Sequence, residues 1–224
     1  TSVAANSSDT TGNLTSSTGY SFNCHAGATW ATQLNLTVSV NPPPVTNYFT
    51  ANANPITYNT ATTLNWSASG TLAACYLYGG RFGAGTSVAG SGSDTTGALT
   101  SSTGYNFNCH DGVNWATQLN LTVNIIPPSI STFTNNSPIL YNTAATLSWT
   151  GVASAGSCSI DNGIGNVGIA SSGNTSTGNI ITTTLYTLTC TGYGTPATAQ
   201  TTVTVNPPPV AATFTANPNP IPYN

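Results

Sequence analysis

The stretch SSTGYNFNCH at Ser101–His110 sets apolar and polar residues in alternation. Tyr105, Phe107 and Cys109 fall on one face of an extended strand, and the asparagines between them fall on the other. A period of two is typical of a β-strand that is buried on one side. The stretch therefore predicts a strand whose tyrosine, phenylalanine and cysteine point into a core.

The same stretch occurs twice, because SSTGYSFNCH at Ser16–His25 differs from it at a single position. The match extends in both directions: Thr1–Val40 matches Thr86–Ile125, and Asn41–Asn59 matches Asn206–Asn224. Self-similarity at a fixed period indicates a chain built from copies of one structural unit, here of about 80 residues. The repeat predicts the C-terminal half of one unit at 1–41, complete units at 42–126 and 127–206, and the first strand of a further unit at 207–224.

The complete units share an order of motifs that the second unit displays most clearly. After a proline-rich junction come TLSW (146–149), SCSI (157–160), LYTLTC (185–190) and TTVTV (201–205). This order resembles the immunoglobulin-like repeats that occur in tandem on bacterial surface proteins. The resemblance implies an all-β fold of tandem immunoglobulin-like antiparallel β-sandwiches, with partial sandwiches at both chain ends. In antibody domains the tryptophan follows the first cysteine, whereas here it precedes it, so the antibody disulfide geometry is not carried over.

Each complete unit contains two cysteines at a similar separation: Cys75 with Cys109, and Cys158 with Cys190. Matching pairs predict one disulfide per unit and an oxidising, extracellular location. The alternative, four buried thiols in a cytosolic protein, is disfavoured because free thiols rarely recur in register. Cys24 corresponds to Cys109, and we expect its partner upstream in a longer repeat chain. Subunits that join end to end are disfavoured, since neither terminal segment contains a counterpart of the first cysteine.

Charged residues make up 2% of the chain, with one Lys or Arg and four Asp or Glu, against about 25% in average proteins. A single cation cannot neutralise a phosphate backbone, which argues against nucleic-acid binding. No apolar run approaches the roughly 20 residues of a membrane-spanning helix. A surface this poor in charge lacks electrostatic repulsion, so we expect it to be hydrated by polar groups or attached sugars, or packed against neighbours.

Candidate glycosylation sites are frequent. Asn-x-Ser/Thr triplets begin at Asn6, Asn13, Asn35, Asn65, Asn120, Asn135 and Asn174. Asn35 and Asn120 occupy equivalent outward positions in the two copies of one strand. O-linked sugars on the abundant hydroxyls are an equal alternative.

Histidine and aromatic side chains gather near the cysteines. His25 and His110 each follow a cysteine, and we interpret HAG and HDG as tight hairpin turns, not as metal sites. The aromatic residues Trp30, Trp115, Tyr76 and Tyr78 are candidates for stacking on sugar rings or for packing. Strand parity places Trp115 on the inward face with Leu119 and Leu121, which favours a packing role.

No catalytic constellation is recognisable, because the four aspartates are scattered and no serine has a convincing base. We predict a structural protein that is not an enzyme, needs no cofactor, and self-associates into an extracellular filament, fibre or surface stalk. Covalent glycans are expected on it. The alternative is an adhesin or a carbohydrate-binding repeat module.

Overall fold

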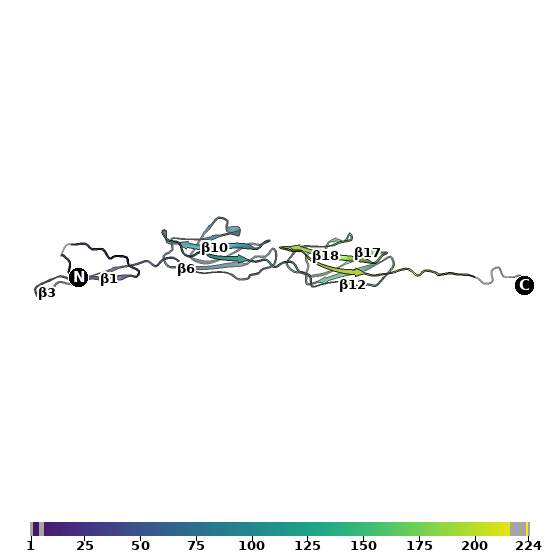
Figure 1. The fold of residues 1–224 in the computed structure, drawn as a ribbon, viewed down its shortest axis with the longest axis horizontal. Coiled ribbons are helices and arrows are strands. Elements are labelled where there is room, and N and C mark those ends of the chain that lie inside the picture. Colours follow the sequence, from purple (N-terminus) through teal and green to yellow (C-terminus); the bar gives the residue numbers. More distant parts are fainter. Residues whose placement is uncertain (1, 5–6, 216–222, 224) are drawn as a thin grey trace. The chain divides into compact units, whose positions relative to one another are not determined.

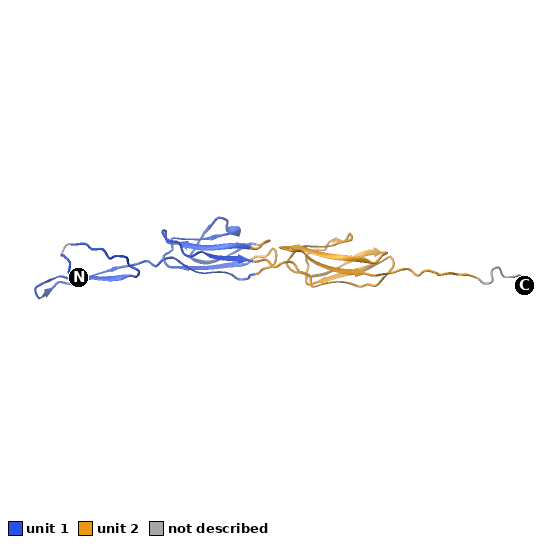
Figure 2. Ribbon diagram, in the orientation of Figure 1, with its two compact units in different colours: residues 1–54, 62–97, 103–123 blue, residues 55–61, 98–102, 124–224 orange. Residues whose placement is uncertain are grey.

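The computed structural model describes residues 2–4, 7–215 and 223, and in this part of the chain the secondary structure is strand apart from one short 3-10 helix, η1 (Gly80–Phe82). The predicted all-β class is confirmed. The chain divides into two compact units (Figure 2): residues 1–54, 62–97 and 103–123 form unit 1, and residues 55–61, 98–102 and 124–224 form unit 2.

Unit 1 begins with a hairpin whose strands repeat the last two strands of a sandwich. Strand β1 (Thr18–Phe22) pairs antiparallel with β4 (Leu34–Val38), and β2 (His25–Ala26) pairs with β3 (Thr29–Trp30) beyond it. This β1–β4 hairpin has no opposing sheet among the described residues.

The first sandwich follows in unit 1 and has two antiparallel sheets (Figure 1). One sheet has the order β5 (Val45–Ala51), β6 (Thr63–Ser69), β9 (Ser91–Thr95). The other has the order β11 (Leu119–Val123), β10 (Thr103–His110), β7 (Ala74–Tyr78), β8 (Thr86–Val88). The alternating side chains meet between the sheets as predicted, and the residues buried there include Leu64, Trp66, Leu77, Tyr105, Phe107 and Cys109.

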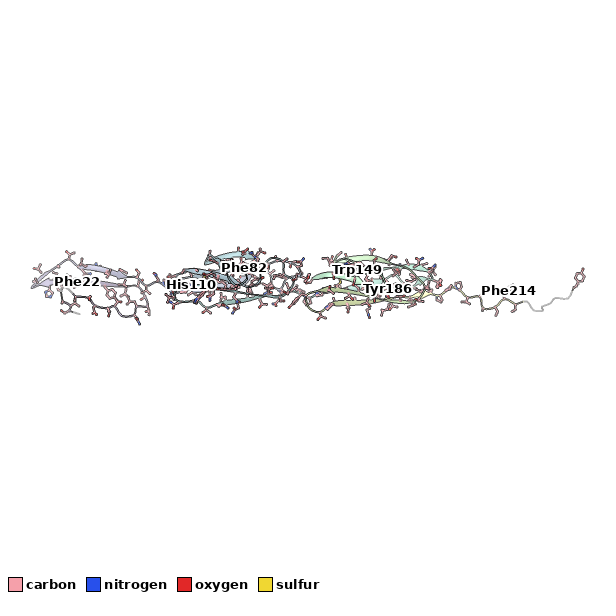
Figure 3. The ribbon with its side chains drawn as sticks, turned by 90° about the horizontal axis from the view of Figure 1, so that it is seen from above. Phe22, Phe82, His110, Trp149, Tyr186 and Phe214 are labelled. Atoms are coloured by element: carbon pink, nitrogen blue, oxygen red, sulfur yellow. A yellow bond between two sulfur atoms is a disulfide. The ribbon has the colours of Figure 1, made fainter. Side chains whose placement is uncertain are left out.

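The second sandwich lies in unit 2 and repeats this plan. Its sheets have the orders β12 (Thr132–Asn135), β14 (Thr143–Thr150), β17 (Ser172–Ile180) and β16 (Gly165–Asn166), β15 (Ala155–Ile160), β18 (Thr184–Gly192), β19 (Ala197–Val203). A short strand, β13 (Ile139–Leu140), pairs in parallel with β20 (Val205–Asn206). The core contains Leu147, Trp149, Tyr186, Leu188 and Cys190, again on the predicted faces (Figure 3).

A tryptophan opposite a glycine recurs in both sandwiches. Trp66 pairs in register with Gly92, and Trp149 pairs with Gly173. A Cβ atom added to Gly173 would lie 2.5 Å from the indole Cζ2 of Trp149, and one added to Gly92 would lie 3.0 Å from that of Trp66. Each indole therefore occupies the space that a side chain on the neighbouring strand would fill.

Unit 2 also contains the loop 55–61, which is held by a buried serine. The Oγ of Ser154 accepts a hydrogen bond from the Tyr58 amide (2.8 Å) and donates one to the Ile126 carbonyl (2.5 Å). Ser154 is 9% exposed and has a left-handed backbone conformation, with φ of 55°. One hydroxyl thus satisfies two backbone groups that strand pairing leaves unbonded.

The C-terminal segment is only partly described. Residues 207–215 have no strand, and residues 216–222 and 224 lie outside the described residues. The prediction that 207–224 begins a further repeat, like the predicted boundaries of the repeats before it, stays a prediction.

Candidate functional site: an exposed aromatic row

The structure contains both predicted disulfides, Cys75–Cys109 and Cys158–Cys190. In each pair the two cysteines are directly opposite one another on neighbouring antiparallel strands of the same sheet. Their Cα atoms are 4.0 and 4.1 Å apart, in the range of a non-hydrogen-bonded strand pair. Each bridge therefore joins two strands within a sheet, whereas in antibody domains the bridge joins the two sheets.

Cys24 is exposed and has no disulfide partner within the described part of the chain. It follows Phe22, which is 38% exposed, at the end of the β1–β4 hairpin.

The sequons differ in how their amide nitrogens are used. The Nδ2 of Asn65 donates to the Oδ1 of Asn52 (2.8 Å), and the Nδ2 of Asn135 donates to the Thr201 hydroxyl (2.7 Å) and the Thr202 carbonyl (2.9 Å). An N-linked glycan needs this nitrogen, so these two sites are already engaged.

The other described sequon asparagines are exposed, namely Asn13, Asn35, Asn120 and Asn174. Asn35 and Asn120 accept equivalent hydrogen bonds from Gln33 (2.7 Å) and Gln118 (2.8 Å). Asn6 lies outside the described residues.

The histidine that follows each cysteine begins a turn, as the sequence indicates. His110 forms an antiparallel bridge with Trp115, and the Asp111 carboxylate closes the turn between them. It accepts hydrogen bonds from the amides of Asn114 (2.6 Å) and Val113 (2.8 Å). These backbone bonds, the Asn114 bond foremost, and the side-chain bond from Asn114 lower the pKa of Asp111.

The prediction that Trp115 packs inward is wrong, because its side chain is 55% exposed. Strand parity applies only along a continuous strand, and residues 116–118 separate Trp115 from β11. Ala116 takes the inward place and is 8% exposed. A slip of one residue moves a side chain to the opposite face, which is what happens here.

Trp115 joins three other rings on the outer face of the β11–β10–β7–β8 sheet. The His110 and Trp115 ring centroids are 4.5 Å apart, and Tyr76 lies 6.1 Å from His110 and 6.3 Å from Trp115. Tyr78 continues the line, 6.2 Å from Tyr76. We call these four side chains the aromatic row. In the β1–β4 hairpin segment the corresponding pair, His25 and Trp30, has a centroid distance of 4.6 Å.

The cation of unit 1 is committed to local contacts. Arg81 forms an ion pair with Asp94, its Nε donates to the Thr95 carbonyl, and its guanidinium lies 4.5 Å from the centre of the Phe82 ring.

No cluster of three or more His, Cys, Asp or Glu suited to a metal ion is found in residues 2–4, 7–215 and 223. Within the same residues no helix is long and apolar enough to cross a membrane.

The fold and these sites define a tandem array of immunoglobulin-like sandwiches, each with a disulfide inside one sheet. The sequence matches no protein-family model and no curated protein.

Three solved structures illustrate the similarity of the fold. They are Sidekick-1 immunoglobulin domains 1–5 (15% identity, 84% of this chain and 45% of that chain, TM-score 0.38), the titin I-band fragment I67–I69 (12%, 85% and 75%, 0.39) and the full ectodomain of mouse nectin-like molecule 4 (10%, 81% and 72%, 0.36). This chain spans less than half of the Sidekick-1 structure. The immunoglobulin-like assignment rests on the strand pairing, and we take no function from these proteins.

Proposed function

We propose that the chain belongs to an extracellular structural array in which immunoglobulin-like repeats follow one another in series, as in a filament, fibre or surface stalk. The supporting observation is the exposed face of the β1–β4 hairpin. Tyr20 and Phe22 are 36% and 38% exposed, whereas their equivalents in the first sandwich, Tyr105 and Phe107, are 1% and 0% exposed. The same sequence is thus buried when a second sheet covers it.

The first sandwich indicates what the missing sheet looks like. There Phe107 meets Phe49 and Trp66 from the opposite sheet, at centroid distances of 6.0 and 6.2 Å. The hairpin also exposes Leu34 and Leu36, at 66% and 65%. Burying such side chains favours association by about 25 cal/mol per Å² of apolar surface. We propose that a sheet of the β5–β6–β9 type covers this face.

The surface chemistry also supports the proposal. With a single Lys or Arg in 224 residues, neighbouring chains have little charge to repel one another. Disulfides persist in oxidising compartments, which favours an extracellular or cell-surface location. The resemblance to bacterial surface repeats agrees with this, and glycans on exposed sequons would add hydration.

The test is peptide mapping of the native material without reduction, with electron microscopy of the same sample. We expect Cys24 to be joined to a cysteine in a segment like that around Cys75, and linear particles to be seen. The Cys158–Cys190 peptide in the same digest controls for loss of disulfides during handling. Reduced Cys24 beside an intact Cys158–Cys190 bridge, or isolated compact particles, would rule the proposal out.

The second candidate, an adhesin or carbohydrate-binding array, is favoured by a separate observation, the exposed aromatic row. It is compatible with a structural array, since one repeat can both extend a chain and bind a ligand.

A further inference from the structure

We infer that the aromatic row of Tyr76, Tyr78, His110 and Trp115 is a binding surface for an uncharged, pyranose-based glycan. Four rings in continuous contact lie on the outer face of a sheet. The rings of Tyr76 and His110 are nearly parallel, with an interplanar angle of 8°. Flat rings that share a direction suit a flat ligand, such as a sugar with an apolar C–H face.

The fold itself does not require these rings. Aligned on the disulfides, the second sandwich has Ser159 where the first has Tyr76, and Thr191 where the first has His110. Both sandwiches nevertheless build the same sheet with the same in-register cysteine pair. An exposed tryptophan that the scaffold does not need is more informative than a buried one.

The rings are held in place before any ligand arrives. Gly85 lies against Tyr78, because a Cβ on that glycine would be 2.8 Å from the Cε1 of the tyrosine. The Nδ1 of His110 accepts a hydrogen bond from the Gly112 amide (3.0 Å), so the neutral ring carries its proton on Nε2. A surface that is already ordered loses little conformational entropy on binding.

Amide side chains line the row on one side. Asn106 and Asn108 are opposite Tyr78 and Tyr76 across the β10–β7 pair, and Asn120 is opposite Asn106 on β11. Primary amides both donate and accept hydrogen bonds, as sugar hydroxyls do. A protein interface would instead be expected to surround its aromatic residues with apolar neighbours.

Charge decides against other flat ligands. Single-stranded nucleic acids stack on aromatic rings but also need cations along the backbone, and Arg81 is already paired with Asp94. The carboxylate nearest the row, that of Asp111, is occupied by the amides of Val113 and Asn114. The row therefore matches a ligand without net charge.

The test is binding of the whole chain to an array of neutral hexopyranose glycans printed beside sialylated and sulfated ones. We expect binding to neutral glycans that is unchanged between low and high salt. Trp115→Ala and Tyr76→Ser should each weaken it at least about tenfold. Tyr76→Ser introduces the residue that the second sandwich has at this position, so the sheet is expected to fold.

Tyr141→Ala is the matched control, because Tyr141 is an exposed tyrosine (45%) in the second sandwich; it should leave binding unchanged. Three results would overturn the inference: no binding to any neutral glycan, binding that survives both row variants, or salt-sensitive binding to acidic glycans alone. Self-association lost with Trp115→Ala, without glycan binding, would make the row a protein interface instead. None of these results bears on the serial array, whose test depends on Cys24.

Discussion

Tyr105 and Tyr186 occupy equivalent positions in the two sandwiches, and their hydroxyl groups differ in what they meet. The Tyr186 hydroxyl is hydrogen bonded to Thr177, whereas the buried Tyr105 hydroxyl has no hydrogen-bond partner among the described residues. Burial raises the pKa of both side chains above that of an ordinary tyrosine. The two sites therefore form a natural pair for measuring the cost of an unsatisfied polar group.

Replacing Tyr105 by Phe should leave the free energy of unfolding unchanged or raise it by about 1–3 kcal/mol, because a desolvated hydroxyl is removed. Tyr186→Phe should lower it by about 0.5–1.5 kcal/mol, because a hydrogen bond is lost. Urea unfolding of both variants beside the parent chain measures the two changes. A larger loss for Tyr105→Phe than for Tyr186→Phe would contradict this account.

At the scale of the strands, the Trp–Gly pairs explain why two glycines stand in the middle of β9 and β17. Glycine is unfavourable within a strand unless another group approaches closely. Here that group is an indole from the adjacent strand, at Trp66 and at Trp149.

Gly173→Ala should destabilise the chain by about 1–3 kcal/mol, because the added methyl group forces the Trp149 indole from its place. Gly104→Ala is the control, since a Cβ at Gly104 meets no atom within 4 Å; its effect should stay within about 0.5 kcal/mol. Thermal unfolding of the two variants is the measurement. Equal effects at both glycines would show that backbone propensity, and not the indole, sets the cost.

At the scale of the whole molecule, the scarcity of charge and the disulfides together govern resistance to proteolysis. Trypsin has a single site in the printed sequence, after Arg81. That residue lies inside the segment closed by the Cys75–Cys109 bridge, and its side chain is tied to Asp94 and Thr95.

We expect slow cleavage, and the two products should migrate as one species until they are reduced. Gel electrophoresis with and without reductant after a timed digestion checks this. Separate fragments in the unreduced lanes would mean that the Cys75–Cys109 bridge is not formed in solution.

Much of the architecture was predictable from order along the chain. The period of two identified the inward faces of the Tyr105–Cys109 and Tyr186–Cys190 segments, and the recurrence of the cysteines identified the two bridged pairs. Both are local or repeated patterns, and neither needs knowledge of which strands become neighbours. The turn after His110 was likewise evident from its residues.

Only the tertiary structure decided the rest. Whether a bridge lies within a sheet or between sheets, whether a tyrosine hydroxyl finds a partner, and which glycine faces an indole all depend on strand neighbours that are distant in sequence. The exposure of Trp115, and with it the aromatic row, depends on a break in the strand at 116–118 that parity alone does not reveal. Local alternation determines a strand's faces, but the packing of separate strands determines what each face meets.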